Sequence, residues 1–399
     1  MKKLMSGIFL VTGTSIGGGM IMLPAVIGVY GYLSAVSILT AVWFFNTIIA
    51  LIFLEANCYL PARTNLISMT KQLMGPRFEW LTWIICLGFL YTIMCVYIAG
   101  MTDIIGGFLE KNAIIIPSTY LSVLSVMAVA LPIYFGMTSV SGFNRLIVTA
   151  MFLAFVILVF LIIPHIEMDT LFNTPTRFPV MALPIVFTSF GFLIVIPGLR
   201  TWLDDDIKKI KTAIILGSLI PLIFYIIWIT VVMGVIPVSG KGGLQMILEQ
   251  VEPIKQMTNT LTSQAVRPAI ALFIQLFVLF AIVSSFLGIS LGLYDFLADG
   301  CRIPKNPRGK LMLLVLTFLP SLLIALTQER LFLTALGFVG LISTVLFGLY
   351  PLMLAWSGRY LRKLPTHYQI SAHKVVFLLM GIFCMLIIGV ELLTLLWRT

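Results

Sequence analysis

Apolar stretches of about 20 residues recur along the whole of this 399-residue chain. A helix of that length crosses the roughly 30 Å hydrocarbon core of a bilayer, and only 10% of the residues are charged, against about 25% in soluble domains. We therefore predict an all-α polytopic membrane protein with a single transmembrane domain over residues 1–399. The eleven predicted spans lie near residues 7–29, 33–57, 80–107, 118–136, 145–164, 179–202, 211–236, 265–298, 310–327, 331–357 and 374–397.

Two segments between the spans are also expected to be structured. Residues 64–76 are mildly amphipathic, which predicts a short linking helix on the membrane surface. Residues 238–264 form the largest predicted loop and have room for short helices of their own.

The basic residues are unevenly divided between the two sets of loops. Most of the 25 Lys and Arg residues fall on the side of the N-terminus. Cytoplasmic loops are enriched in positive charge, so we predict a cytoplasmic N-terminus and an external C-terminus. The net charge of +10 then reflects topology and contact with anionic lipids, and no nucleic-acid partner is expected.

The sequence contains no motif typical of enzymatic or ATP-driven chemistry. The five cysteines are scattered and the three histidines fall in predicted loops, so no Cys/His spacing typical of a metal site appears. No P-loop, HExxH or GxSxG motif occurs. We expect neither an enzyme nor a cofactor, and no ring of charges indicates a channel pore.

The first predicted span contains three consecutive glycines, in "TGTSIGGGMIMLP" (12–24). Glycine costs about 1 kcal/mol relative to alanine inside a helix, and non-helical backbone in a membrane survives only inside protein or along a cavity. An unwound segment would offer N–H groups to a carboxylate and carbonyls to a cation. The alternative is close helix packing, since Gly13 and Gly17 are four residues apart. The candidate substrate-binding residues here are Thr14, Ser15, Gly17, Gly18 and Gly19.

The sixth predicted span is interrupted in a similar way, in "ALPIVFTSFGFLIVIPGL" (182–199). Interrupted helices five spans apart are typical of two inverted five-span repeats with a substrate site between them. We assign the repeats to 7–164 and 179–357, with 374–397 as an extra helix. Further candidate substrate-binding residues are Thr188, Ser189, Phe190, Gly191 and Phe192, together with Tyr91 of the third span.

Four stretches carry a resemblance to a known family: "GTSIGGGMIMLP", "FTSFGF", "AIILGSLIPLIFYIIWITVVMGVIP" and "FAIVSSFLGISLGLYDFLADG". Together they resemble the bacterial aromatic amino acid permeases, which include tyrosine- and tryptophan-specific members of the hydroxy and aromatic amino acid permease family. The resemblance covers essentially the whole chain. It implies a leucine-transporter-type (LeuT-like) fold and import across the inner membrane, usually driven by protons. One departure is Leu193, which stands where the family is expected to have histidine.

The eighth span suggests where a coupling ion could bind. Ala281, Ser284 and Ser285 have the A-x-x-S-S spacing that faces the first span in sodium-coupled relatives of this fold. With the carbonyls of Gly13 and Ile16 they would form an oxygen shell for Na⁺. Alternatively, the serines bond to carbonyls of their own helix. The usual proton coupling of the family favours H⁺ over Na⁺.

Acidic residues near the inner ends of spans are candidates for gating or coupling, because burying their charge in a membrane is costly. Glu55 and Asp295 could share Arg or Lys partners as ion pairs of an inner gate, or carry a proton. The run Asp204, Asp205 and Asp206 is expected to cap the seventh span.

These observations predict a secondary transporter that imports an aromatic amino acid and works as a monomer in the bacterial inner membrane. Aromatic residues near the breaks suit an aromatic substrate, and the resemblance places tyrosine ahead of tryptophan. The alternative is a transporter of another neutral amino acid, such as serine, threonine or a branched-chain residue, coupled to sodium.

Overall fold

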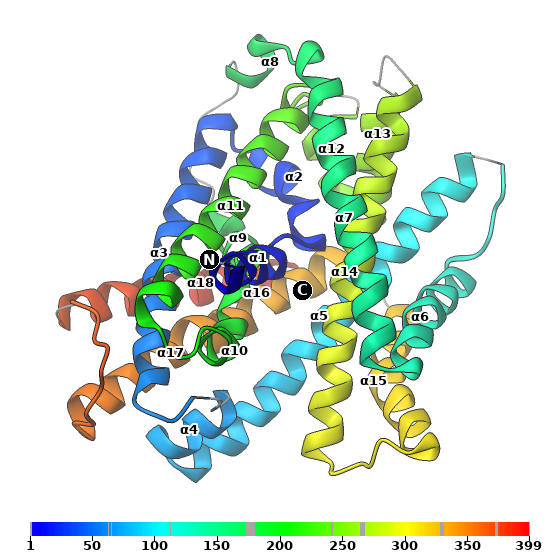
Figure 1. Ribbon diagram of the computed structural model, residues 1–399. Coiled ribbons are helices and arrows are strands. Elements are labelled where there is room, and N and C mark those ends of the chain that lie inside the picture. The colour runs from blue at the N-terminus through cyan, green and yellow to red at the C-terminus, as the bar shows by residue number, and fades with distance from the viewer. Residues whose placement is uncertain are drawn as a thin grey trace.

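The computed structural model describes residues 2–62, 64, 66–111, 113–172, 180–240, 242–263, 268–327, 331–371 and 374–398. Most of these residues are helical, and there is no strand among them (Figure 1). The long helices are α3 (Tyr32–Cys58), α5 (Pro76–Lys111), α6 (Ser118–Phe135), α7 (Met137–Ile162), α11 (Ile207–Met233), α14 (Pro268–Gly300), α15 (Pro307–Thr327) and α18 (Lys374–Arg398). One further long segment consists of α16 (Leu331–Ser343), the π-helical η5 (Thr344–Leu349), α17 (Tyr350–Trp356) and the π-helical η6 (Ser357–Leu361).

Ten segments of the described chain are long and apolar enough to cross a membrane, whereas we predicted eleven. The difference lies in the first predicted span, which is divided into α1 (Lys2–Ser15), the 3-10 turn η1 (Gly18–Met20) and α2 (Leu23–Gly28). At 1.5 Å per residue, neither α1 nor α2 alone reaches across roughly 30 Å of hydrocarbon. The other ten predicted spans each coincide with one of the observed segments.

The shorter helices agree with the expectations for the loops. The predicted surface helix appears as α4 (Leu66–Met74), and the largest loop carries α12 (Leu244–Glu249) and α13 (Pro253–Ser263). Asp206 is the N-cap of α11 and accepts a hydrogen bond from the Lys209 backbone N–H at 3.1 Å, as predicted. The remaining short elements are η2 (Ile163–His165), α8 (Met168–Phe172), η3 (Val180–Ala182) and, within the sixth predicted span, α9 (Leu183–Ser189), η4 (Phe192–Val195) and α10 (Ile196–Trp202).

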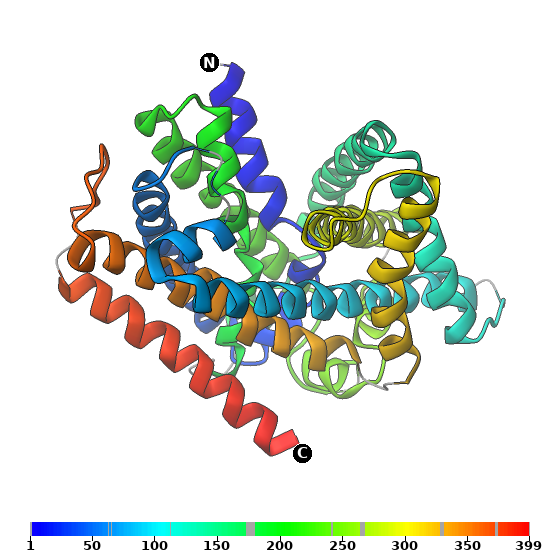
Figure 2. The ribbon, with the colours of Figure 1, turned by 90° about the horizontal axis from the view of Figure 1, so that it is seen from below.

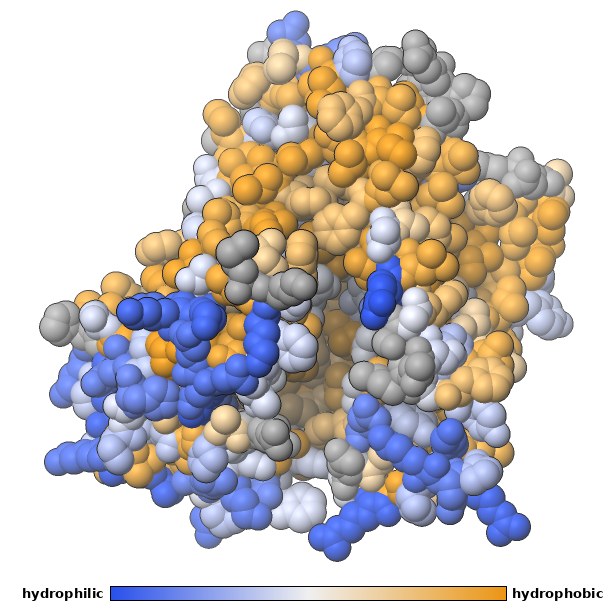
Figure 3. Space-filling view, in the orientation of Figure 1, coloured by the Kyte–Doolittle hydropathy of each residue, from blue (hydrophilic) through white to orange (hydrophobic). Residues whose placement is uncertain are grey.

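The helices pack into one body whose outer surface is largely apolar. α14 lies along α7 (Figure 1), while α5 and the α16–α17 segment cross the molecule next to each other with α18 at the outer edge (Figure 2). Large apolar side chains on α6, α15 and α18 are exposed. An apolar surface of this extent is stable against lipid and not against water. Hydrophilic residues gather in the lower half of the face in Figure 3, on both sides of a hollow.

Candidate substrate site

The first helix break lies where the glycines predicted it. α1 ends at Ser15, Ile16 and Gly17 are outside any helix, and helical structure resumes with η1 at Gly18 and with α2 at Leu23. Pro24 stands in the first turn of α2, where the missing N–H of proline costs nothing. The glycines weaken the helix and the proline sets its restart, so both causes of the break are local.

The second break follows the same pattern. α9 (Leu183–Ser189) is followed by Phe190 and Gly191 outside the helices, then by the 3-10 turn η4 (Phe192–Val195) and by α10 (Ile196–Trp202). Both α9 and α10 begin with proline in the first turn. The prediction of two interrupted helices is therefore confirmed. Leu193, at the expected histidine position, is fully buried in η4.

The two breaks are joined by Tyr225 of α11, a residue that the sequence did not single out. The fully buried Tyr225 hydroxyl lies 2.7 Å from the carbonyl oxygen of Ser15 and 2.6 Å from that of Ser189. These are the carbonyls at the last residues of α1 and α9. A phenol has one proton to donate, so the two carbonyls share it. Tyr225 thus fixes the spacing between the two helix ends.

The predicted hydroxyl ligands at the breaks are bonded to their own helices. Thr14 donates to Leu10 and Val11, Ser15 to Val11, Thr188 to Pro184 and Ser189 to Ile185, all carbonyls of the preceding turn. Thr188 also lies 2.9 Å from the Ser343 hydroxyl of α16. Such back-bonding satisfies the proton of each hydroxyl while leaving its lone pairs available as acceptors.

The aromatic residues predicted near the site point in different directions. Phe190 and Phe192 are fully buried, and the Phe190 ring packs edge-on against Tyr225 at 5.2 Å. The Tyr91 hydroxyl donates to the carbonyl of Leu316 on α15 at 2.7 Å, so this group faces α15. Tyr97, which lies on α5 as Tyr91 does, is at the first break, because its hydroxyl would be 3.9 Å from a Cβ atom on Gly17.

The two serines of the predicted cation site face different neighbours. Ser285 contacts the first break closely, since a Cβ atom on Gly17 would lie 2.4 Å from its Oγ. Ser284 instead donates to Asn144 Oδ1 of α7 at 2.9 Å. Ala281 and Ile16 are buried, whereas Gly13 is exposed. Of the two serines in the A-x-x-S-S motif, Ser285 therefore lies at the first break, and Ser284 is hydrogen-bonded to α7.

The two predicted inner acids each have a basic partner, in different environments. Glu55 is fully buried and binds the Arg359 guanidinium of η6 through both carboxylate oxygens; it also accepts from the Tyr59 hydroxyl at 2.6 Å and the Ile370 N–H at 3.0 Å. Asp295 pairs with Lys305 at 2.7 Å, with both side chains about half exposed. Each acid therefore has a basic partner, as expected, but the two acids do not share one.

Arg200 of α10, which no sequence motif singles out, forms a second buried connection. It binds both oxygens of Asp205, at 2.6 and 2.9 Å, and donates to the backbone carbonyls of Asn57 and Leu60 at the end of α3. The hydrogen bond from Arg200, with the charges of Arg200 and His367, holds the pKa of Asp205 below its usual value although partial burial raises it. Only Asp206 of the three aspartates acts as the cap, because Asp204 pairs with Lys3 at 2.6 Å.

A cavity of about 870 Å³ lies beside the second half of the broken sixth span. Its walls come from α3, α4, α5, α14 and η5, and from Ile194, Pro197 and Gly198 of η4 and α10. Lys3, Thr201 and Asp204 supply polar groups in an otherwise apolar lining. The cavity is large enough for an amino acid, since small-molecule sites are typically about 300–1,000 Å³.

Within the described residues, the ten apolar segments and the two interrupted helices joined by Tyr225 indicate an integral membrane protein. The chain matches the model of the tryptophan/tyrosine permease family over residues 1–391. The chain belongs to this family, so it is a permease and not an enzyme.

Individual relatives agree with this assignment. Over 368 residues the chain is 30% identical to tyrosine-specific transport system 1 of Haemophilus influenzae, covering 90% of this chain and 89% of that protein. It is 29% identical over 367 residues to a tryptophan-specific transport protein of Pseudomonas aeruginosa, covering 90% and 87%. It is 28% identical over 369 residues to the low affinity tryptophan permease of Escherichia coli, covering 90% and 88%.

Proposed function

We propose that this protein imports an aromatic amino acid, tyrosine in preference to tryptophan, by symport with an ion across the bacterial inner membrane. The observation that carries the proposal is the pair of helix breaks held together by Tyr225. Interrupted helices in corresponding positions mark the substrate site of inverted-repeat transporters. The proposal includes two such repeats, 7–164 and 179–357, and a cytoplasmic N-terminus.

The substrate is proposed to lie against both breaks. The N–H groups of Gly17, Gly18 and Gly19 would hold its carboxylate at the start of η1. Its ammonium would meet the Ser15 and Ser189 carbonyls, since each carbonyl oxygen has a second lone pair beside the one that faces Tyr225. Phe190, Gly191 and Phe192 of the second break and the neighbouring Thr188 would contact its side chain.

The coupling ion is proposed to be H⁺. Glu55 and Asp295 are already neutralised by Arg359 and Lys305, which supports a gating role for these pairs over proton carriage. The contact of Ser285 with the first break favours the alternative, a sodium-coupled transporter of another neutral amino acid.

Uptake of labelled tyrosine into proteoliposomes tests the function and the ion together. We expect accumulation with an imposed proton gradient and none with a sodium gradient alone. Accumulation with sodium alone would instead assign coupling to Ser285. If tyrosine does not accumulate under either gradient, the proposal of an aromatic substrate is wrong. Competition with serine, threonine and branched-chain amino acids then identifies which neutral amino acid is transported.

Tyr225→Phe is expected to reduce this uptake by roughly tenfold, because it leaves two buried carbonyls without their shared donor, a loss of about 1–3 kcal/mol. Initial rates at equal protein content measure the effect. Tyr32→Phe is the matched control, since the Tyr32 hydroxyl also meets α11 but lies 2.9 Å from the side-chain hydroxyl of Thr230. Equal losses in the two variants would contradict a specific role for Tyr225.

A further inference from the structure

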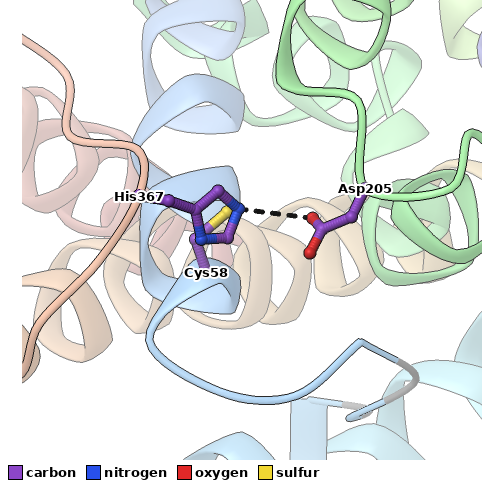
Figure 4. A group of neighbouring side chains, drawn as sticks. All are labelled: Cys58, Asp205 and His367. Atoms are coloured by element: carbon purple, nitrogen blue, oxygen red, sulfur yellow. Dashed lines mark ion pairs between the residues drawn. The ribbon is translucent and has the colours of Figure 1, made fainter.

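Three side chains that are far apart in the sequence meet beside the C-terminal end of α3 (Figure 4). Cys58 is the last residue of α3, Asp205 lies between α10 and α11, and His367 lies in the segment that joins η6 to α18. Their ligand atoms are all within 4.8 Å of one another, and His367 Nε2 is 3.4 Å from Asp205 Oδ1. No spacing rule could have found this group, because its members come from three separate elements.

Each of the three is held in place by contacts of its own. Arg200 orients Asp205 through both carboxylate oxygens, while it also binds the end of α3. The segment carrying His367 is anchored three residues later, where the Ile370 N–H donates to Glu55 and the Ile370 carbonyl accepts from Arg359 at 2.9 Å. The cluster is therefore built on fixed backbone, which a binding site requires.

We propose that Cys58, Asp205 and His367 form a binding site for a divalent cation that favours sulfur and nitrogen ligands, such as Zn²⁺. A thiolate, an imidazole and a carboxylate are its usual protein ligands. Bonds of about 2.0–2.3 Å in a tetrahedral site separate the ligand atoms by roughly 3.3–3.8 Å, so the group needs only a small contraction. Cys58 is buried and His367 is exposed, which leaves an entry path and a solvent position for a fourth ligand.

The charges around the cluster set the expected strength of binding. On binding, the Cys58 thiol releases its proton to solvent, and the thiolate and Asp205 together neutralise the 2+ charge of the ion. Arg200 adds one positive charge beside Asp205. The hydrogen bonds from Arg200 use one lone pair on each carboxylate oxygen of Asp205 and leave the other lone pairs free. The site should therefore be weaker than a closed structural zinc site and suited to reversible occupation.

Occupation of the site would link elements that belong to different parts of the permease. The ion would tie the loop after α10, the second half of an interrupted helix, to the end of α3 and to the segment before α18. Transport by alternating access requires such parts of a transporter to move relative to each other. We therefore infer that the ion slows transport. This last step rests on the proposed function, whereas binding of the ion does not.

Titration of the purified full-length protein with Co²⁺, followed by Zn²⁺, tests the site without any transport assay. We expect thiolate-to-cobalt absorption in the near ultraviolet that saturates at about one equivalent and that Zn²⁺ removes. Cys58→Ser should abolish the band, and His367→Ala, at an exposed position, should weaken binding by roughly tenfold or more. Cys301→Ser, which removes an exposed thiol elsewhere, should leave it unchanged.

Two results would overturn the site: no thiolate band in the wild-type protein, or a band that survives Cys58→Ser. In proteoliposomes, Zn²⁺ on the side of the cluster should lower uptake by the wild type and not by His367→Ala. Equal inhibition of both would reject the regulatory role. If the wild type transports no amino acid at all, the proposed function fails while the binding result stands.

Discussion

Gly17→Val is expected to lower uptake of labelled aromatic amino acid by at least roughly tenfold while the protein still inserts into the membrane. A Cβ atom at this position would lie 2.4 Å from Ser285 Oγ and 3.4 Å from Ser285 Cβ. Ser285 would have to rotate, and the larger valine side chain would push the first break away from α14. Because η1 and α9 lie side by side there, the displacement also disturbs the second break.

Gly288→Val is the matched control for this substitution. Gly288 lies in α14, as does Ser285, and is exposed. Apart from its chain neighbours and the nearby backbone of α14, no atom of the described residues lies within 4 Å of its Cβ position. Initial uptake rates, normalised to protein content in the membrane, should be unchanged in this variant. If Gly17→Val transports at the control rate, the close contact between the first break and α14 is not required for transport.

The largest effect on stability is expected from breaking the Glu55–Arg359 pair. Glu55 is fully buried and the Arg359 side chain is 8% exposed. Removing one partner leaves an uncompensated buried charge, which costs about 3–5 kcal/mol. We expect Glu55→Gln to lower markedly the midpoint of heat denaturation of the purified protein in detergent. The double variant Glu55→Gln/Arg359→Met should recover part of the loss, since it removes the unpaired charge.

Asp295→Asn provides the comparison, because the Asp295–Lys305 pair is about half exposed. Exposed ion pairs contribute about 0–1 kcal/mol, so its midpoint should stay close to that of the wild type. A Glu55→Gln protein as heat-stable as Asp295→Asn would show that the buried pair is not a structural link. A normally stable but uncoupled Glu55→Gln protein would instead support proton carriage by Glu55.

Features with a local cause could be predicted from the sequence alone. The membrane spans follow from the length of the apolar stretches, and the breaks follow from glycines and from prolines at the helix restarts. The cap at Asp206 depends on a residue only three positions away. The interruption of the first span was predicted from its glycines, whereas the lengths of the resulting helices, each too short to cross the membrane alone, were not.

The direction of each side chain around its helix was decided only by the tertiary structure. The sequence did not single out Tyr225 or Arg200, and it did not show that Ser284 faces α7 or that the Tyr91 hydroxyl faces α15. It also did not bring Cys58 near His367. In a soluble protein an apolar stripe shows which face of a helix is buried. A membrane helix is apolar both toward lipid and toward its neighbouring helices. Which side of it turns toward the protein interior is therefore fixed only when the helices pack.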